Sequence, residues 1–261
     1  MNTAELSFYN MIWIYSLSLI PVILFILTDT SLVRRSLGAI LRMSIQLFLV
    51  GLYLEVVFTT NHPLINFSWI LIMILVANFN IRSNSGLKSK PLFLITFTGL
   101  SISTILIVAF FILFAVGPTP FYDARYLIPI SGMILGNCLR GNIVGLERYT
   151  SQIRDREEEY INFLFMGATP FEASRPIFST SVQSALAPTV STMATMGLVS
   201  LPGMMTGQIL GGASPGTAIR YQIGVMIAIF ASTTLGVFIN LFLCSRHLFD
   251  NFGFVKEVYR K

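Results

Sequence analysis

Repeated runs of about twenty apolar residues constrain this chain more than any other feature of its sequence. The run 92–116 contains no charged residue, and neither does the run 8–27. A bilayer core about 30 Å thick accommodates a helix of this length, whereas a water-exposed surface does not. Hydrophobic residues make up 54% of the chain and charged residues only 11%, far below the roughly 25% of a soluble domain. The sequence therefore predicts an all-α, polytopic transmembrane protein in a cell membrane and excludes a soluble globular domain.

Seven segments are predicted to cross the membrane. In chain order they are 8–27, 37–58, 67–81, 92–116, 126–146, one within 185–210, and 221–244. The fifth is interrupted by Asn137, Arg140 and Asn142, and the sixth has the least defined boundaries. The seven segments together form a single transmembrane domain over residues 1–261.

Positive charge alternates between the loops that join these segments. Because Lys and Arg are retained on the cytoplasmic side, we expect the N-terminus outside the cell and the C-terminus in the cytoplasm. Seven spans satisfy that arrangement, whereas six would not. The basic regions carry Arg34 and Arg35; Arg82, Lys88 and Lys90; Arg148, Arg154, Arg156 and Arg175; and Arg246, Lys256, Arg260 and Lys261.

The longest hydrophilic stretch, residues 147–184, lies on the predicted cytoplasmic side. Its first part, 147–166, is predicted to form a charged helix with one apolar face. Gly167 is expected to end that helix, because glycine readily adopts the left-handed conformation found at helix ends. The segment 147–184 is therefore the first place to look for a contact with a soluble protein.

A second helix is predicted to start two residues after Gly167. Thr169 is a suitable N-cap, Pro170 fits the first helical position, and Glu172 completes a capping box. Two interpretations remain open: a well-capped connecting loop, or a short, rigid helix whose exposed Phe171 inserts into the groove of a soluble partner. The candidate coupling residues are Gly167, Ala168, Thr169, Pro170, Phe171 and Glu172.

Several segments resemble one known family. They are IPISGMI at 128–134 followed by Gly136 and Asn137, GATP at 167–170, GLVSLPGMMTG at 197–207, and AIRYQI at 218–223. These are similar to the FetB-type permeases, and the similarity extends over about 37–243. That family is described as the membrane half of an iron-export ABC transporter, and its plant relatives are linked to aluminium tolerance. The resemblance implies a permease subunit for metal export and iron homeostasis in an inner or plasma membrane.

The chain lacks an ATP-binding signature of its own. Gly86-Leu87-Lys88-Ser89 lacks the glycine and the spacing of a P-loop. We therefore expect no cofactor on this chain, and the resemblance implies a separate ABC ATPase subunit that binds ATP and Mg²⁺. A pathway between subunits would require a homodimer of the permease. Because the basic residues lie between apolar runs, a membrane lipid environment is expected and nucleic acid is not.

The sequence does not favour catalysis within the membrane. The sequence contains no Ser-His-Asp set, HExxH motif or paired carboxylate that would suggest intramembrane catalysis. Two alternatives remain open: a non-transporting subunit that relays ATPase motion, and an exporter of a non-metal solute such as a nucleotide sugar.

Helix-breaking residues mark the candidate pathway. Prolines and small polar residues are concentrated between 170 and 212, and helix breaks at membrane depth are tolerated only within protein or beside a cavity. Packing between helices is the competing explanation. The candidate pathway residues are Asn137, Pro188, Pro202, Met204 and Met205.

Three residues are candidate metal ligands. Glu55 lies near the outer end of the second apolar run, where a carboxylate is costly and is often functional. Met193 and Met196 offer thioethers, which suit Cu(I) better than iron or aluminium, although methionine is also a common packing residue. Arg42 and Arg140 lie toward the inner ends of their segments, where snorkelling to the interface explains them.

Overall fold

The computed structural model describes residues 8–28, 30–85, 90–249 and 256. Within these ranges every regular element is a helix, which confirms the predicted all-α class. Six helical segments of the described chain are long and apolar enough to cross a membrane. The P-loop-like segment 86–89 and the basic residues Arg260 and Lys261 lie outside the described residues, and the predicted orientation stays a prediction.

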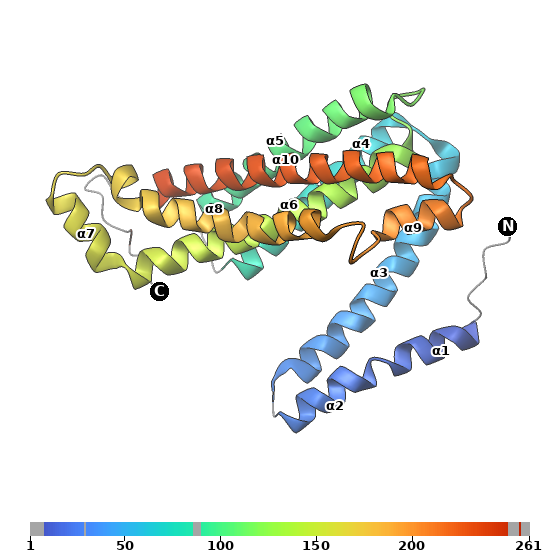
Figure 1. Cartoon of the computed structure of the whole chain (residues 1–261), viewed down its shortest axis with the longest axis horizontal. Coiled ribbons are helices and arrows are strands. Elements are labelled where there is room, and N and C mark those ends of the chain that lie inside the picture. The colour runs from blue at the N-terminus through green and yellow to red at the C-terminus, as the bar shows by residue number, and fades with distance from the viewer. Residues whose placement is uncertain (1–7, 29, 86–89, 250–255, 257–261) are drawn as a thin grey trace. The chain divides into compact units, whose positions relative to one another are not determined.

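The chain divides into two compact units, one comprising Met1–Thr60 with Leu210–Gly212 and the other Asn61–Ile209 with Ala213–Lys261. The first unit contains α1 (Phe8–Ser16), α2 (Leu19–Leu27) and α3 (Leu32–Thr60) (Figure 1). Helices α1 and α2 replace the single predicted helix 8–27. Pro21 explains the division, because its ring clashes with the carbonyl group of Leu17 and it has no N–H to donate.

The described residues of the second unit form seven α-helices and one π-helical turn. Helix α10 packs along α5, α6 and α8, while α4 packs against α5 and α6 (Figure 1). The elements are α4 (Pro63–Asn84), α5 (Lys90–Phe110), the π-helix η1 (Phe111–Val116), α6 (Ala124–Asp155), α7 (Glu157–Phe165), α8 (Pro170–Thr195), α9 (Gly203–Leu210) and α10 (Pro215–Leu248).

The sixth predicted span, within 185–210, is divided rather than continuous. Helix α8 ends at Thr195 and α9 begins at Gly203. The break contains Gly197 and Pro202. Gly197 has φ +88°, which does not continue a helix, and Pro202 has no N–H to donate to a preceding turn. By contrast, Pro176 and Pro188 lie inside α8 without ending it, although prolines were expected to break this region. Each removes one backbone hydrogen bond, and packing of α8 against α6 and α10 maintains the helix.

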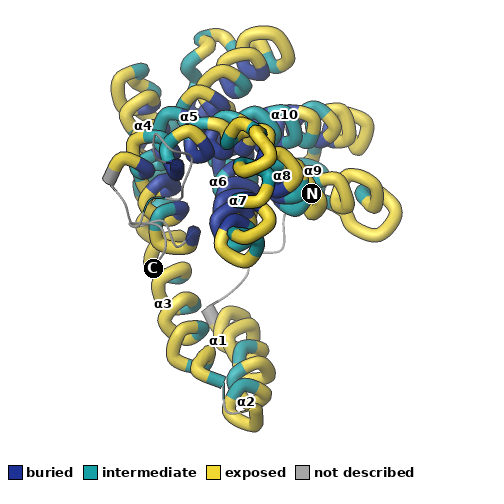
Figure 2. The backbone as a smooth tube through the Cα atoms, turned by 90° about the vertical axis from the view of Figure 1, so that its left-hand side faces the viewer, coloured by how far each residue is buried: buried dark blue, intermediate teal, exposed yellow. Residues whose placement is uncertain are grey.

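The core lies where α5, α6 and α10 meet, and α6 and α10 carry long buried stretches (Figure 2). Small residues allow this close approach. A Cβ atom on Gly236 of α10 would lie 2.7 Å from Sγ of Cys138 and 2.9 Å from Oγ of Ser103. Buried polar side chains join the same helices: Cys138 Sγ lies 3.6 Å from the carbonyl oxygen of Ser232.

Candidate functional site

The turn between α7 and α8 begins with a defined helix ending. Gly167 has φ +90°, its N–H donates to the carbonyl oxygen of Leu164 at 3.0 Å, and the N–H of Ala168 donates to that of Phe163 at 3.0 Å. These two bonds make a Schellman motif, which requires a left-handed residue at the position of Gly167. The predicted helix end at Gly167 is confirmed.

A complete capping box follows at the start of α8. Oγ1 of Thr169 accepts from the N–H of Glu172 at 3.3 Å, and Oε2 of Glu172 accepts from the N–H of Thr169 at 2.8 Å and from its hydroxyl at 2.7 Å. Pro170 is the first helical residue. The backbone bond from Thr169, followed by its hydroxyl bond, lowers the pKa of the Glu172 carboxyl, because both bonds favour the charged form. The predicted capping box is confirmed.

The lengths of the flanking helices differ from the prediction. The charged helix expected at 147–166 is not one element, because α6 continues to Asp155 and α7 covers only Glu157–Phe165. The helix that follows Thr169 is not short: α8 has 26 residues. Local signals set where α8 begins, but burial of its apolar side chains against α6 and α10 sets how far it continues.

The tip of the turn exposes two large apolar side chains. Phe165 is 79% exposed and Met166 is 73% exposed. Phe171 is 47% exposed, and its ring packs against Phe178 at 6.3 Å and Phe242 at 6.2 Å between centroids. Phe171 was the docking residue predicted from the sequence. Phe165 and Met166 were not predicted for that role, although their position immediately before Gly167 could have identified them.

Aromatic contacts fix this turn to the rest of its unit. The ring of Tyr160 in α7 stacks on Phe249 at 4.9 Å with an interplanar angle of 12°. Tyr149 of α6 meets Phe178 of α8 edge-on at 6.4 Å. A force applied at the turn would therefore reach α6, α8 and α10 together.

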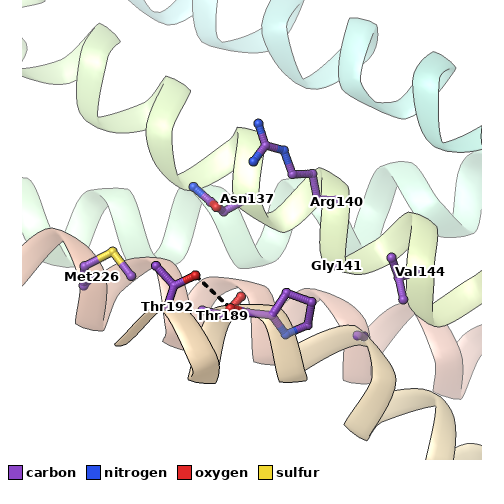
Figure 3. A pocket seen from close by; sticks show the side chains of 9 residues that line it. Asn137, Arg140, Gly141, Val144, Thr189, Thr192 and Met226 are labelled. Atoms are coloured by element: carbon purple, nitrogen blue, oxygen red, sulfur yellow. Dashed lines mark hydrogen bonds between the residues drawn. The ribbon is translucent and has the colours of Figure 1, made fainter. Parts of the chain in front are cut away.

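A pocket of about 180 Å³ lies between α6, α8 and α10 (Figure 3). It brings together two of the predicted pathway residues, Asn137 and Pro188, while Pro202, Met204 and Met205 do not line it. Arg140, Thr189 and Thr192 also line the pocket, and none of the three was predicted from the sequence as a site residue. The lining is completed by Gly141, Val144, Ala185 and Met226.

Hydrogen bonds within the helices orient part of this lining. Nδ2 of Asn137 donates to the carbonyl oxygen of Met133 at 2.8 Å, and Oγ1 of Thr192 donates to that of Pro188 at 2.9 Å, as the dashed line in Figure 3 shows. A Cβ atom on Gly141 would lie 2.5 Å from Cγ2 of Thr233, so α6 and α10 touch directly beside the pocket. The pocket therefore has a tightly packed wall and a lining that is polar only in part, through Asn137, Arg140, Thr189 and Thr192.

The predicted metal ligands have ordinary surroundings. Glu55 is an exposed residue of α3. Sδ of Met196 accepts a hydrogen bond from Nε2 of Gln222 at 3.9 Å, and Met193 is 37% exposed. The part of the chain that the structure describes contains no group of three or more His, Cys, Asp or Glu residues that could hold a metal ion. The assignment of Glu55, Met193 and Met196 as ligands stays a prediction.

Comparison with known proteins identifies relatives over most of this chain. The model of the uncharacterised protein family UPF0014 matches residues 8–249. A UPF0014 membrane protein of Synechocystis, slr1647, is 36% identical over 74% of this chain and 75% of its own length. No solved structure matches the chain.

Two further relatives have names that refer to a metal. The protein of Escherichia coli named as a probable iron export permease, FetB, is 32% identical over 80% of each chain. The protein ALUMINUM SENSITIVE 3 of Arabidopsis thaliana is 30% identical over 87% of this chain and 81% of its own length. The sequence similarity to FetB-type proteins is therefore confirmed, and the chain is a multi-pass membrane protein like its relatives.

Proposed function

Because the chain belongs to the UPF0014 family of membrane proteins, we propose that it is the permease subunit of an ABC transporter that exports a metal ion such as iron, or a metal-related solute. A separate ATPase subunit would bind ATP and Mg²⁺ and hydrolyse the nucleotide. The name of the Escherichia coli relative supports the transport role and the direction.

The observation that carries the proposal is the geometry of the α7–α8 turn. Its direction is fixed by the Schellman motif at Gly167 and the capping box at Thr169. Its tip presents Phe165 and Met166 to solvent. Exposed apolar side chains on a rigid turn are typical of a protein-docking site rather than of a free loop.

Helix α8 connects this turn to the pocket. Pro188 lines the pocket and lies eighteen residues beyond Pro170 on the same continuous helix, which corresponds to about 27 Å. A displacement of the turn by the ATPase would therefore move one wall of the pocket. We propose that this lever couples hydrolysis to opening of the pathway.

The proposed transporter contains two copies of the permease. In a single chain the pocket is lined only by α6, α8 and α10, and a second copy would enclose it. The competing role, a non-transporting relay subunit, would need the same ATPase contact but no solute pathway.

The proposal is tested by co-expressing the chain with ABC ATPase subunits of its own genome and purifying the complex. We expect a complex with two copies of each chain, ATPase activity, and ATP-dependent transport of iron in proteoliposomes. A permease that purifies folded but captures no ATPase would contradict the proposal. A complex that hydrolyses ATP without moving any solute would favour the relay role.

A further inference from the structure

One of the residues that line the pocket between α6, α8 and α10 is a cation, Arg140 of α6. Arg140 lies fifteen residues after Arg125 and eight before Arg148 on the continuous helix α6, which places it about 22 Å and about 12 Å from the charged residues at the two ends of the span. Helix α6 is one of the six helical segments that can cross a membrane. A guanidinium facing lipid at this position is costly, and such residues usually face a protein interior or a water-filled cavity.

Arg140 has no hydrogen bond or ion pair with any other side chain that the structure describes. The other polar residues that line the pocket are neutral: Asn137 lies one turn away on the same helix, and Thr189 and Thr192 belong to α8. Arg140 is an exposed residue, and its side chain extends away from the two threonines in Figure 3. Snorkelling alone would explain an isolated arginine, but it does not explain why amide and hydroxyl groups from two helices surround the same cavity.

The charge of the lining selects the kind of ligand. No acidic residue is among the nine residues that line the pocket. A bare divalent or trivalent cation prefers carboxylate and carbonyl oxygens, and the one charged residue among those that line this pocket, Arg140, would repel it. An anion in the pocket would instead gain N–H donors of the guanidinium once the exposed, flexible Arg140 side chain turns toward it, and the hydroxyl group of Thr189 lines the same pocket.

The size of the pocket limits what enters it. Its volume of about 180 Å³ is below the roughly 300–1,000 Å³ of pockets that enclose a drug-sized ligand. One copy of the chain therefore accommodates a charged group rather than a whole large solute.

We propose that this pocket binds the negatively charged group, carboxylate or phosphate, of the exported solute. Arg140 supplies the charge, and Asn137 and Thr189 supply hydrogen bonds. This inference rests on the proposed permease function and specifies its substrate class. If the cargo is a metal, it crosses as an anionic complex and not as the free ion.

The test is equilibrium binding to the purified permease in nanodiscs without ATPase, so that it does not depend on coupling. The probes are ferric citrate, citrate, a nucleoside diphosphate and Fe²⁺ alone. We expect at least one anion to bind the parent, and Arg140→Gln to weaken that binding roughly tenfold to a hundredfold, because a charge-assisted pair is lost. Arg140→Lys should restore part of the affinity, since it keeps the charge but not the forked donors.

Comparison of the anionic probes identifies which anionic group, carboxylate or phosphate, the pocket binds. Tighter binding of citrate species than of the nucleoside diphosphate would indicate a carboxylate ligand, and the reverse would indicate a phosphate. Arg148→Gln, on the same helix but outside the pocket, is the matched control and should bind the anion like the parent.

Three results would overturn the inference. The first is that Fe²⁺ alone binds the parent and the Arg140→Gln variant equally well. The second is that no anion of the panel binds the parent more tightly than it binds the Arg140→Gln variant. The third is that Arg140→Gln changes only the amount of phosphatidylglycerol that the permease retains from the nanodisc. The last would assign Arg140 to a lipid headgroup. A parent that binds anions but never an ATPase would contradict the proposed function, while the anion site at Arg140 would remain without a role in transport.

Discussion

The side-chain amide of Asn240 in α10 donates a hydrogen bond of 2.7 Å to Oδ1 of Asn142 in α6, and both side chains are buried. Asn142 in turn donates to the carbonyl oxygen of Cys138 at 2.8 Å. The two residues are 98 positions apart, so this pair fixes the register of two long helices. Interhelical hydrogen bonds of this kind compensate for the weak hydrophobic attraction between helices in lipid.

We expect Asn142→Leu to destabilise the second unit by about 0.6–1.7 kcal/mol, the range measured for hydrogen bonds between membrane helices. The loss arises because the amide of Asn240 is left buried without this acceptor. Unfolding of the purified protein in detergent measures the effect. Asn80→Leu, at an exposed position of α4, is the control, and equal stability of the two variants would contradict a structural role for the pair.

Gly236→Ala should destabilise the protein by about 1–3 kcal/mol through overpacking. Its new Cβ atom would lie 2.7 Å from Sγ of Cys138 and 3.2 Å from Nδ2 of Asn142. Gly216→Ala in the same helix has no atom within 4 Å of its Cβ and should be neutral or slightly stabilising, because alanine is the better helix former. Thermal unfolding of the two variants side by side decides whether close helix approach limits the residue at position 236.

The α7–α8 turn should couple the permease to its ATPase. Thr169→Ala removes the N-cap, at a cost of about 0.5–2 kcal/mol to the start of α8, and Gly167→Val forces a β-branched residue into a left-handed conformation. Both variants should insert into the membrane normally and bind the ATPase less well or fail to transport. Ser179→Ala, at an exposed position farther along α8, is the control for co-purification and transport.

Phe165→Asp should weaken ATPase binding without destabilising the permease, because this side chain is 79% exposed. Phe171→Asp should weaken both, since its ring packs against Phe178 and Phe242. Co-purification combined with thermal unfolding separates the two effects. If both variants capture the ATPase as the parent does, the partner docks elsewhere and the turn is only a connection.

The predicted orientation is checked with introduced cysteines. Cysteine at Thr119, between η1 and α6, should be labelled by an impermeant reagent in intact cells, and cysteine at Asn162, in α7, only after permeabilisation. Both positions are exposed, and the native Cys138 and Cys244 are buried and should react slowly. Labelling of position 162 in intact cells would show that the topology is the reverse of the predicted one.

The sequence alone determined the class of the protein, the positions of most spans and the turn at Gly167. These features depend on residues close together in the chain. A run of apolar side chains identifies a spanning helix, and Thr169 and Glu172 form their capping box from three positions apart. Because such local interactions do not depend on tertiary contacts, they can be predicted from the sequence.

Only the tertiary structure determined how far the helices continue and which side chains they bring together. Pro176 and Pro188 were expected to break a helix, yet both lie inside the continuous helix α8. The position of Arg140 in the sequence indicates only snorkelling, whereas the structure shows that Arg140 of α6 and Thr189 of α8 line the same pocket. The length of α8 and the grouping of these side chains depend on packing between segments tens of residues apart, and no local pattern encodes which faces of two helices will meet.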